Sequence, residues 1–305
     1  MKLSLLMATY CGNKFISQQL QSLLDQSRQF DEVVIIDDGS TDNMVAIVNK
    51  FISDNGLSGS WKVYVNERNK GWKRNFIEGV EKTTGDIFFF CDQDDIWFKD
   101  KIRVQAEIIE NNDNVSVVAS PEISKYNDKK SYRVSNDFKI LDVCKNPKNY
   151  LNIMNGCSMA VRRSFYDSVK EYWIDGWAHD QFMWQMALIN DALAVMTSPT
   201  LYRRLHDKNA SRKKRTLEST VFECQSFIAA LKQILIYLET NSNSAKLKDQ
   251  KIFITNERIR AIEKRLLLLE HKKISVIPSL LRDRYRIYWR KRQVIKDILL
   301  ALKLL

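Results

Sequence analysis

The chain has 305 residues, 45% of them hydrophobic, and its few Gly (9) and Pro (4) residues argue against disorder and against a loop-rich all-β protein. Its five cysteines are odd in number and form no CxxC pair, which favours reduced thiols over disulfides or a zinc site. The formal charge of +11 lies entirely in residues 246–305, which hold 17 Lys and Arg against 6 Asp and Glu, so the chain is unlike a uniformly basic nucleic-acid binder.

The first hundred residues alternate between apolar runs and amphipathic segments. Strands are predicted at 3–10, 32–40, 61–67 and 86–95, with helices at 13–27, 41–54 and 71–83 between them. Such alternation predicts a parallel sheet with crossover helices. Ligands bind at the carboxyl ends of the strands in these sheets, where the segments TY, DDGS and CDQDD fall.

The middle of the chain continues this pattern less regularly. A helix followed by a strand (VSVVAS) is predicted for residues 97–118, and residues 119–150 are expected to be irregular. GCSMAVRR predicts a strand that leads into a helix at 164–171, and GWAHDQF predicts a loop before a helix that ends near 190. One further strand is predicted within 191–205.

The C-terminal residues differ from the rest in composition. A helix is predicted at 217–240, a linker at 241–250, and basic amphipathic helices at 251–273 and 279–305 with Pro278 between them. The apolar N-terminus is too short for a signal peptide. No uninterrupted stretch of about 18 apolar residues occurs, so no membrane span is expected.

Three carboxylates, Asp92, Asp94 and Asp95, follow the apolar run IFFF. They repel one another unless something neutralises them, and a divalent cation with oxygen ligands, Mg²⁺ or Mn²⁺, does so economically. The alternative is a solvated acidic turn that caps the next helix. Their place at the carboxyl end of a predicted strand favours the metal site.

The motif Asp37-Asp38-Gly39-Ser40 also follows a predicted buried strand. A carboxylate there can accept hydrogen bonds from a base or ribose, although an Asx turn with a helix cap explains the motif equally well. Tyr10, which follows the first strand, is suited either to stacking on a base or to packing in the core.

Cations and possible proton acceptors follow later in the chain. Lys73 and Arg74 open a helix and could meet a diphosphate, or they could form a solvated basic face, and the run SRKKR (211–215) has the same two interpretations. Asp180 lies in a loop before a helix, where it could act as a general base or as an N-cap. His206 is flanked by basic residues, which is more typical of a surface histidine than of a ligand.

Taken together, these segments resemble the inverting family 2 glycosyltransferases with the GT-A fold. The resemblance covers roughly residues 1–210 and rests on MATYCGNKFISQQLQSLLDQS, VVIIDDGSTDN, NKGWKRNFIEGVEKTTGDIFFFCDQDDIW, NGCSMAVRR, WAHDQFMW and YRRLHDKNAS, in the family's order and approximate spacing. CDQDDIW is most similar to bacterial rhamnosyltransferase-like members that build surface polysaccharides. The implied fold is α/β, a Rossmann-like, mainly parallel mixed sheet flanked by helices, as a catalytic domain at 1–215 with a C-terminal helical region at 216–305.

The resemblance also implies which residues hold the nucleotide-sugar donor. Thr9 and Tyr10 lie in the first motif, and Tyr10 and Asp38 would sit against the base. Asp37 would shape the turn or reach the ribose, and Asp92 would approach the ribose. Arg74 would lie near the nucleotide.

For the metal and the reaction, the resemblance implies three residues. Asp94 would bind a Mn²⁺ or Mg²⁺ ion that bridges the diphosphate, His206 would be a further ligand of the metal or of the diphosphate, and Asp180 would take the proton of the acceptor hydroxyl. The sugar would then move with inversion in one displacement. Many relatives have Glu-Asp where this chain has His179-Asp180, and many have Asn where it has Cys11.

The basic C-terminal region has two interpretations. Its helices could lie on the anionic inner face of the cell membrane, which suits a cytoplasmic enzyme with a lipid-linked glycan acceptor, or they could form a packing or homo-oligomer element. Two other functions remain for the chain as a whole. A nucleotidyltransferase would share the sheet and the acids, and the pI of 9.3 alone suggests nucleic-acid binding.

Overall fold

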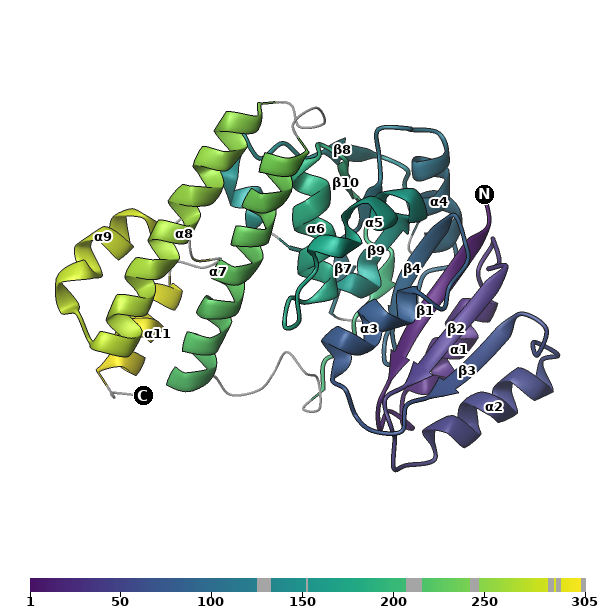
Figure 1. Ribbon diagram of the computed structural model, residues 1–305. Coiled ribbons are helices and arrows are strands. Elements are labelled where there is room, and N and C mark those ends of the chain that lie inside the picture. The colour runs from purple at the N-terminus through teal and green to yellow at the C-terminus, as the bar shows by residue number, and fades with distance from the viewer. Residues whose placement is uncertain are drawn as a thin grey trace.

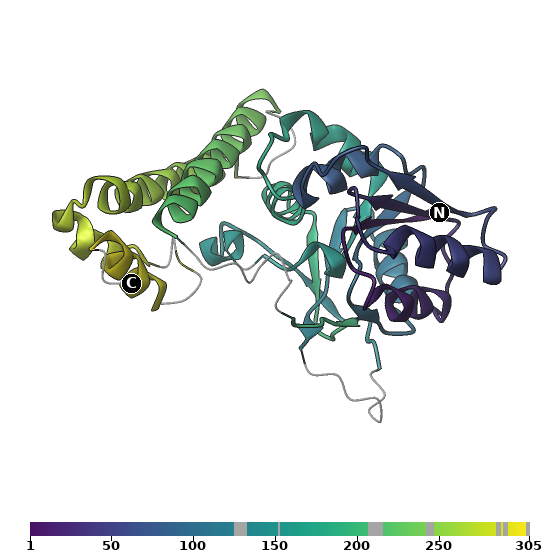
Figure 2. The same ribbon diagram turned by 90° about the horizontal axis from the view of Figure 1, so that it is seen from below.

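The computed structural model of the protein describes residues 1–124, 133–151, 153–206, 216–241, 247–284, 288 and 292–302. An α/β part contains the N-terminus, and a helical part is formed by the C-terminal residues (Figure 1). Viewed from below, the long C-terminal helices extend away from the sheet (Figure 2).

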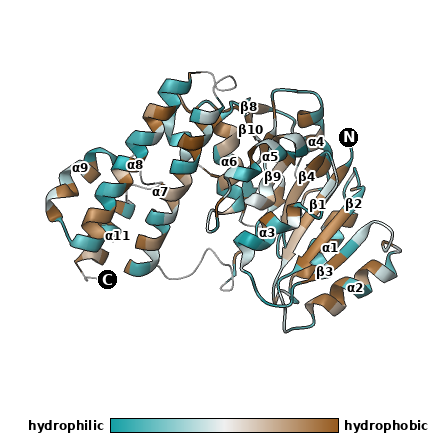
Figure 3. Ribbon diagram, in the orientation of Figure 1, coloured by the Kyte–Doolittle hydropathy of each residue, from teal (hydrophilic) through white to brown (hydrophobic). Residues whose placement is uncertain are grey.

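Four parallel strands form the N-terminal half of the main sheet. They are β1 (Leu3–Thr9), β2 (Glu32–Asp37), β3 (Trp61–Val65) and β4 (Ile87–Asp92), in the order β3-β2-β1-β4. The apolar residues of β1, β2 and β4 are buried on both faces, which explains why these strands are continuous apolar runs (Figure 3). Each fully buried large apolar side chain contributes about 1.5–3 kcal/mol.

Helices cover both faces of this sheet. Apolar residues of α1 (Ile16–Leu24), α2 (Met44–Asp54) and α4 (Lys101–Glu110) share one core cluster with Leu5 and Met7 of β1. Those of α3 (Trp72–Val80), α5 (Arg163–Val169) and α6 (His179–Ile189) share the other cluster with Leu6. The side chains of β1 point alternately to these two layers, as the period of a strand requires.

The second half of the main sheet is mixed. β9 (Met159–Arg162) runs antiparallel to both β4 and β6 (Val117–Ala119), β10 (Leu193–Met196) runs parallel to β6, and β8 (Phe138–Ile140) closes the edge antiparallel to β10. The mainly parallel, mixed sheet implied by the family resemblance is confirmed. The parallel strands predicted from the alternation in the first hundred residues are confirmed in β1 to β4, and the antiparallel strands β8 and β9 come later in the chain.

A small second sheet connects distant loops. β5 (Ile96–Trp97) pairs antiparallel with β11 (Leu201–Tyr202), which pairs parallel with β7 (Glu122–Ile123). The prediction of one strand within 191–205 was wrong, because Pro199 lies between β10 and β11. Residues 119–150 also contain β7, β8 and the 3-10 helix η1 (Pro147–Tyr150), which are too short to give a hydrophobic period.

The helical part consists of α7 (Leu217–Thr240), α8 (Lys248–His271), α9 (Ile277–Arg282) and α11 (Arg292–Ala301), with the 3-10 helix η5 (Ile274–Val276) before α9. The predicted helix at 279–305 was too long, since α9 ends at Arg282. Half of the predicted linker (242–246 of 241–250) and the run SRKKR (211–215) lie outside the described residues, and α8 begins at Lys248, within the predicted linker.

The helical part packs tightly on the α/β part. The Lys251 ammonium donates to the Ile189 carbonyl at 2.8 Å and to the Asp191 carboxylate at 2.7 Å, and the hydroxyls of Tyr150 and Thr255 lie 3.0 Å apart. One hydrophobic cluster includes residues of α6, α7 and α8. The division at residue 215 therefore marks a change of architecture, and its status as a domain boundary stays a prediction.

α7 corrects the expectation about membrane spans. By length and composition, Leu217–Thr240 is apolar enough to cross a bilayer, with a mean hydropathy of 1.4 in its most apolar window, of which 33% is buried. The criterion of an uninterrupted apolar run missed it, because polar residues such as Gln225 and Gln233 interrupt the sequence. Its buried side packs against α8, as the core helix of a globular domain does.

Candidate active site

The ends of β1 and β2 are fixed to each other by a buried carboxylate. Asp37 is opposite Thr9 in the sheet register and accepts a hydrogen bond from the Thr9 hydroxyl at 2.9 Å. It also accepts from the Ser40 backbone N–H at 2.7 Å and from the Ser40 hydroxyl at 2.6 Å. This geometry gives Asp37 a turn-shaping position at the rim of the sheet.

Asp38 organises the segment that leads into α3. Its carboxylate accepts hydrogen bonds from the Asn66 amide at 2.8 Å and from the backbone N–H groups of Lys70 and Gly71, each at 2.9 Å. Gly71 has a φ of 84°, which a side chain would oppose. Asp38 is buried, so any contact with a nucleotide base would be made by the edge of the carboxylate that these donors leave open.

Tyr10 lies exposed beside these two residues. Its side chain is 48% accessible, and its backbone exchanges two hydrogen bonds with the Gln93 amide, at 2.8 and 3.0 Å. Cys11 follows in the left-handed region with a φ of 47°. Asn tolerates that conformation better than other residues with side chains, which gives a physical reason for Asn at this place in relatives.

Asp94 and His206 come together from segments 112 residues apart. His206 Nε2 lies 2.7 Å from Asp94 Oδ2, and the imidazole stacks on Phe15 with ring centroids 4.5 Å apart. The small sheet makes this approach possible, since β5 and β11 hold the 94–97 and 201–206 segments together. The two residues expected to share a cation are therefore neighbours.

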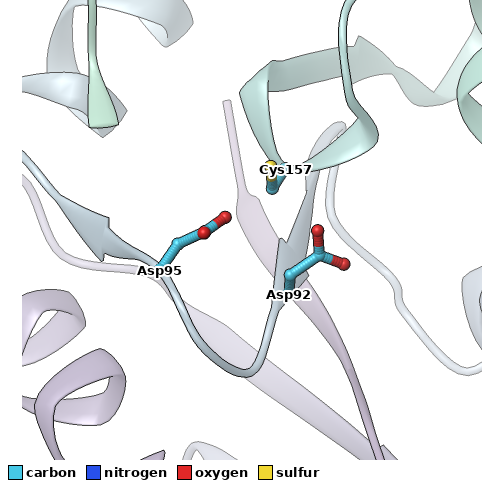
Figure 4. A group of neighbouring side chains, drawn as sticks. All are labelled: Asp92, Asp95 and Cys157. Atoms are coloured by element: carbon cyan, nitrogen blue, oxygen red, sulfur yellow. The ribbon is translucent and has the colours of Figure 1, made fainter. Parts of the chain in front are cut away.

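Asp92 and Asp95 flank the thiol of Cys157 (Figure 4). One ligand atom from each lies within 4.8 Å of the others. Burial and the charge of Asp94 raise the pKa of Asp92 to about 7. Burial and the charges of Asp92 and Asp94 raise the pKa of Asp95 well above its usual range. A group of ionised acids is thus unfavourable without a cation, and these residues fit a divalent ion.

Asp180 stands in the first turn of α6, where its carboxylate accepts a hydrogen bond from the Gln181 N–H at 2.7 Å. Burial raises its pKa to about 6, while Lys73 and Arg203 lower it. The charge of Asp180 in turn raises the pKa of Asp92, so the two carboxylates lie close enough to interact electrostatically. A carboxylate with a pKa just below neutrality suits proton abstraction.

His179, which directly precedes Asp180, is buried among aromatic side chains. Its ring contacts Phe76 and Phe90, with centroids 3.9 and 4.6 Å away, and burial lowers its pKa to about 3. Neither ring nitrogen has a hydrogen-bond partner among the described residues. A neutral imidazole therefore stands where many relatives have glutamate.

Arg74 contacts the loop before Asp180. Its guanidinium donates to Asp175 at 2.8 Å, and the neighbouring Lys73 ammonium donates to the Gly176 carbonyl at 2.6 Å. Both cations thus brace the 175–176 turn from α3. A role for Arg74 in nucleotide binding stays a prediction, and binding there would compete with the Asp175 ion pair.

Sequence reasoning missed three residues at this rim. Arg203, which pairs with Glu122 at 3.2 Å, lowers the pKa values of Asp92 and Asp180. Cys157 was counted as a thiol and given no place in the site. Lys101 is buried, and burial lowers its pKa to about 7, while the charge of Asp95 raises it. The motifs YRRLHD and NGCSMA were the available signals, but neither shows which acids these residues face.

The chain matches the sequence profile described as "Glycosyl transferase family 2" over residues 4–169. It is 28% identical over 226 residues to "dTDP-rhamnosyl transferase RfbG" of Shigella flexneri, a match that covers 67% of this chain and 72% of that protein. Two uncharacterized glycosyltransferases, from a Nostoc species and from Haemophilus influenzae, match over 39% and 43% of their own lengths.

Solved structures show the same fold. TarS of S. aureus, residues 1–349 in complex with UDP-GlcNAc, superposes with a TM-score of 0.63 at 19% identity and covers 99% of this chain and 81% of that one. The mannosyltransferase PcManGT of Pyrobaculum calidifontis, in complex with GDP-Man and Mn²⁺, gives a TM-score of 0.61 at 14% identity and covers 99% and 86%. At these identities the likeness concerns the fold alone.

Proposed function

This chain belongs to glycosyl transferase family 2, and from that premise we propose that it moves a sugar from a nucleotide-diphosphate donor to a hydroxyl of a glycan or lipid-linked acceptor, with inversion. The observation that carries the proposal is the contact of Asp94 with His206 across 112 residues, beside Asp92. A packing role does not explain why acids that repel one another gather around that contact.

The donor is held, in this proposal, along the rim formed by β1, β2 and β4. The exposed ring of Tyr10 stacks on the base, and Asp38 accepts from the base edge, while Asp37 and Thr9 keep that rim in shape. Asp92 faces the ribose. The similarity to a dTDP-rhamnosyl transferase makes rhamnose the first sugar to test, in the synthesis of a bacterial surface polysaccharide.

Asp94 and His206 would hold the divalent cation, Mn²⁺ or Mg²⁺. Carboxylate and imidazole ligands suit Mn²⁺, the ion in the complex of the Pyrobaculum enzyme. When bound, the cation stabilises the negative charge that develops on the leaving diphosphate. Arg203, which already acts on Asp92 and Asp180, adds positive charge at the same rim.

Asp180 takes the proton of the acceptor hydroxyl as the oxygen attacks the anomeric carbon. The new C–O bond forms on the face opposite the departing diphosphate, so the configuration inverts without a covalent enzyme intermediate. With a pKa of about 6, the Asp180 carboxylate is mostly ionised at neutral pH, and its pKa lies near the pH at which the enzyme would work, as efficient general-base catalysis requires. Its hydrogen bond from the Gln181 N–H fixes the carboxylate.

Replacement of Asp180 by asparagine tests this assignment. General-base catalysis is typically worth ~10²–10⁴-fold, so Asp180→Asn should lower kcat by about that factor and leave donor binding unchanged. The amide oxygen can still accept from Gln181, which protects the fold. Asp167→Asn, on the exposed side of α5, is the matched control. A kcat within threefold of wild type would contradict the role of Asp180.

Removal of the cation tests the metal site. EDTA should abolish transfer, and Mn²⁺ or Mg²⁺ should restore it. A panel of nucleotide sugars with either ion, scored by thermal shift, identifies the donor, because a bound ligand stabilises the fold by RT ln(1 + [L]/Kd). Full activity in the chelator would contradict the roles of Asp94 and His206.

Family membership favours glycosyl transfer over the two alternative functions. A nucleotidyltransferase would release pyrophosphate from a nucleoside triphosphate, which a coupled phosphate assay detects. A nucleic-acid binder would bind DNA or RNA with an affinity that falls steeply with salt in a gel-shift assay.

The C-terminal part contributes, in this proposal, the attachment to the cytoplasmic face of the membrane. Three cations of α8 point inward and are not available for lipids. Lys251 pairs with Asp191, Arg258 donates to the Pro147 carbonyl, and Arg265 pairs with the buried Asp297. α8 is therefore a core helix, and these three cations are removed from the predicted membrane surface.

Exposed basic and apolar residues lie side by side in the sequence at the segment formed by residues 272–284, which we propose as the membrane surface. Ile274 and Leu281 are 57% and 42% accessible there, and Lys272, Lys273 and Arg282 surround them with positive charge. Apolar side chains within a basic border fit the headgroup region of an anionic bilayer. A homo-oligomer contact would bury the same residues against a second copy.

Vesicle flotation separates the two interpretations. Lys273→Gln with Arg282→Gln should weaken binding to anionic vesicles roughly 30-fold, since each cation contributes ~1 kcal/mol. Lys62→Gln with Lys145→Gln removes the same charge from the α/β part and should leave flotation unchanged. Equal flotation of both double variants would refute the membrane surface, and a dimer in solution that Ile274→Asn dissociates would establish the oligomer instead.

A further inference from the structure

A thiol lies among the carboxylates of the candidate active site. Cys157 belongs to the 3-10 helix η2 (Gly156–Ser158). Its sulfur faces Asp92, at the end of β4, and Asp95, which directly precedes β5 (Figure 4). The mechanism above uses neither Cys157 nor Asp95. Within the described part of the chain, these three residues form a group of potential metal ligands whose donor atoms lie within 4.8 Å of one another.

Asp95 provides a second observation that points to a ligand. It is 1% exposed, and only one of its carboxylate oxygens, Oδ1, accepts a hydrogen bond from an N–H group, that of Arg204 at 3.3 Å. Oδ2 is buried and has no N–H or O–H donor among the described residues, so its polar neighbour is the Cys157 thiol, a weak donor. A buried carboxylate oxygen served only by a weak donor is costly, and a cation held by the oxygen and the sulfur would satisfy it.

The scaffold holds the sulfur in place. The Gln105 amide donates to the Ser158 carbonyl at 2.8 Å, and the Ser158 N–H and hydroxyl both donate to the Asn155 carbonyl, at 2.9 and 2.7 Å. Bonds to Zn²⁺ are about 2.3 Å long from sulfur and about 2.0–2.2 Å long from a carboxylate oxygen. The donor atoms, which lie within 4.8 Å of one another, would therefore need to approach one another by roughly 1 Å to share one ion.

We propose that Cys157, Asp95 and Asp92 form a mixed sulfur–oxygen site that binds thiophilic divalent cations such as Zn²⁺ and Cd²⁺, beside the Asp94–His206 pair. Sulfur ligands select such ions over Mg²⁺ and Mn²⁺, which prefer oxygen. On binding, the Cys157 S–H bond breaks, an S–metal bond forms and the proton passes to the solvent. Because Asp92 is shared with the proposed donor site, a cation held here would inhibit transfer.

Cadmium titration tests the binding directly, without donor or acceptor. Formation of a Cd²⁺–thiolate bond gives a charge-transfer band in the ultraviolet, and wild type should show it with one equivalent of Cd²⁺. Cys157→Ala and Cys157→Ser should lose the band, and the serine variant keeps the size of the side chain. Asp95→Asn keeps the thiol and should bind at least ~10-fold more weakly. Cys144→Ala is the matched control and should behave as wild type.

Persistence of the band in both Cys157 variants, or unchanged Cd²⁺ affinity in Asp95→Asn, would overturn the site. The inhibition rests on the proposed function and is measured separately. Zn²⁺ should lower the transfer rate of wild type, and Cys157→Ser should require at least ~10-fold more Zn²⁺ for half-inhibition relative to its own zinc-free rate. Binding without inhibition would leave the site standing and refute the link to Asp92.

Discussion

The absence of a side chain at Gly156 allows α6 to pack against the segment that carries Cys157. A Cβ on Gly156 would lie 2.0 Å from His179 Nε2, so the imidazole fits only against glycine. His179 immediately precedes Asp180, and Gly156 immediately precedes Cys157. This contact thus joins the proposed base to the loop that faces Asp92.

Gly156→Ala should therefore disturb both stability and turnover. Overpacking in a close-packed interior costs about 1–3 kcal/mol, and a shift of His179 would move Asp180 with it. We expect a lower Tm and a kcat reduced by roughly tenfold or more, because small displacements of catalytic groups are expensive. Gly59→Ala is the control, since a Cβ there meets nothing within 4 Å. Equal melting curves for the two variants would contradict the packing argument.

The raised pKa of Asp180 predicts the pH dependence of the reaction. A base must be ionised to accept a proton, so activity is present above its pKa and lost as the pH falls through it. The kcat/KM profile of the free enzyme should begin to decline below about pH 7, where Asp92 takes up a proton, and should fall more steeply below about pH 6, where Asp180 does. His179 has a pKa of about 3 and should not contribute near that pH. A flat profile down to pH 5 would exclude Asp180 as the base.

At the scale of elements, α8 is joined to the α/β part by buried polar contacts. Lys251 is 1% exposed, and its ammonium bonds to both Ile189 and Asp191. Asp191 itself stands in the left-handed region with a φ of 55°, in the turn between α6 and β10. Cations that look like a membrane-binding face in the sequence therefore hold the architecture together.

Lys251→Met should weaken that junction. The substitution keeps the length of the side chain and leaves Asp191 and a carbonyl without their donor, at a cost of about 1–3 kcal/mol. Lys50→Met removes a surface pair with Asp54 and should cost less than about 0.5 kcal/mol. Thermal unfolding monitored by circular dichroism compares the two. Equal Tm values would show that the buried contact adds nothing.

For the whole molecule, one apolar cluster crosses from the sheet into the C-terminal helices. It contains Phe182 and Trp184 of α6 together with Leu231 of α7 and Leu268 of α8. Parts that share a core unfold together. We expect one calorimetric transition for the full chain, and an aggregated or unfolded product from a chain that ends at residue 241. Two resolved transitions would instead support independent domains at 1–215 and 216–305.

The sequence alone was sufficient for the strands β1, β2 and β4 and for the polar turns that follow them. Their burial on both faces imposes a local composition, and an apolar run followed by Asp or Gly marks the end of such a strand. For the same reason the ordered motifs led to the correct fold and family. The C-terminal position of the excess charge was equally visible in composition.

The tertiary structure decided which of these turns meet and which charges face solvent. Short strands such as β5 and β11 have too few residues for a period, yet their pairing brings His206 to Asp94. The inward direction of Lys251 and the place of Cys157 between Asp92 and Asp95 depend likewise on contacts between distant segments. Periodicity is a property of neighbouring residues, whereas strand pairing and the packing of helices on a sheet are set by the whole chain.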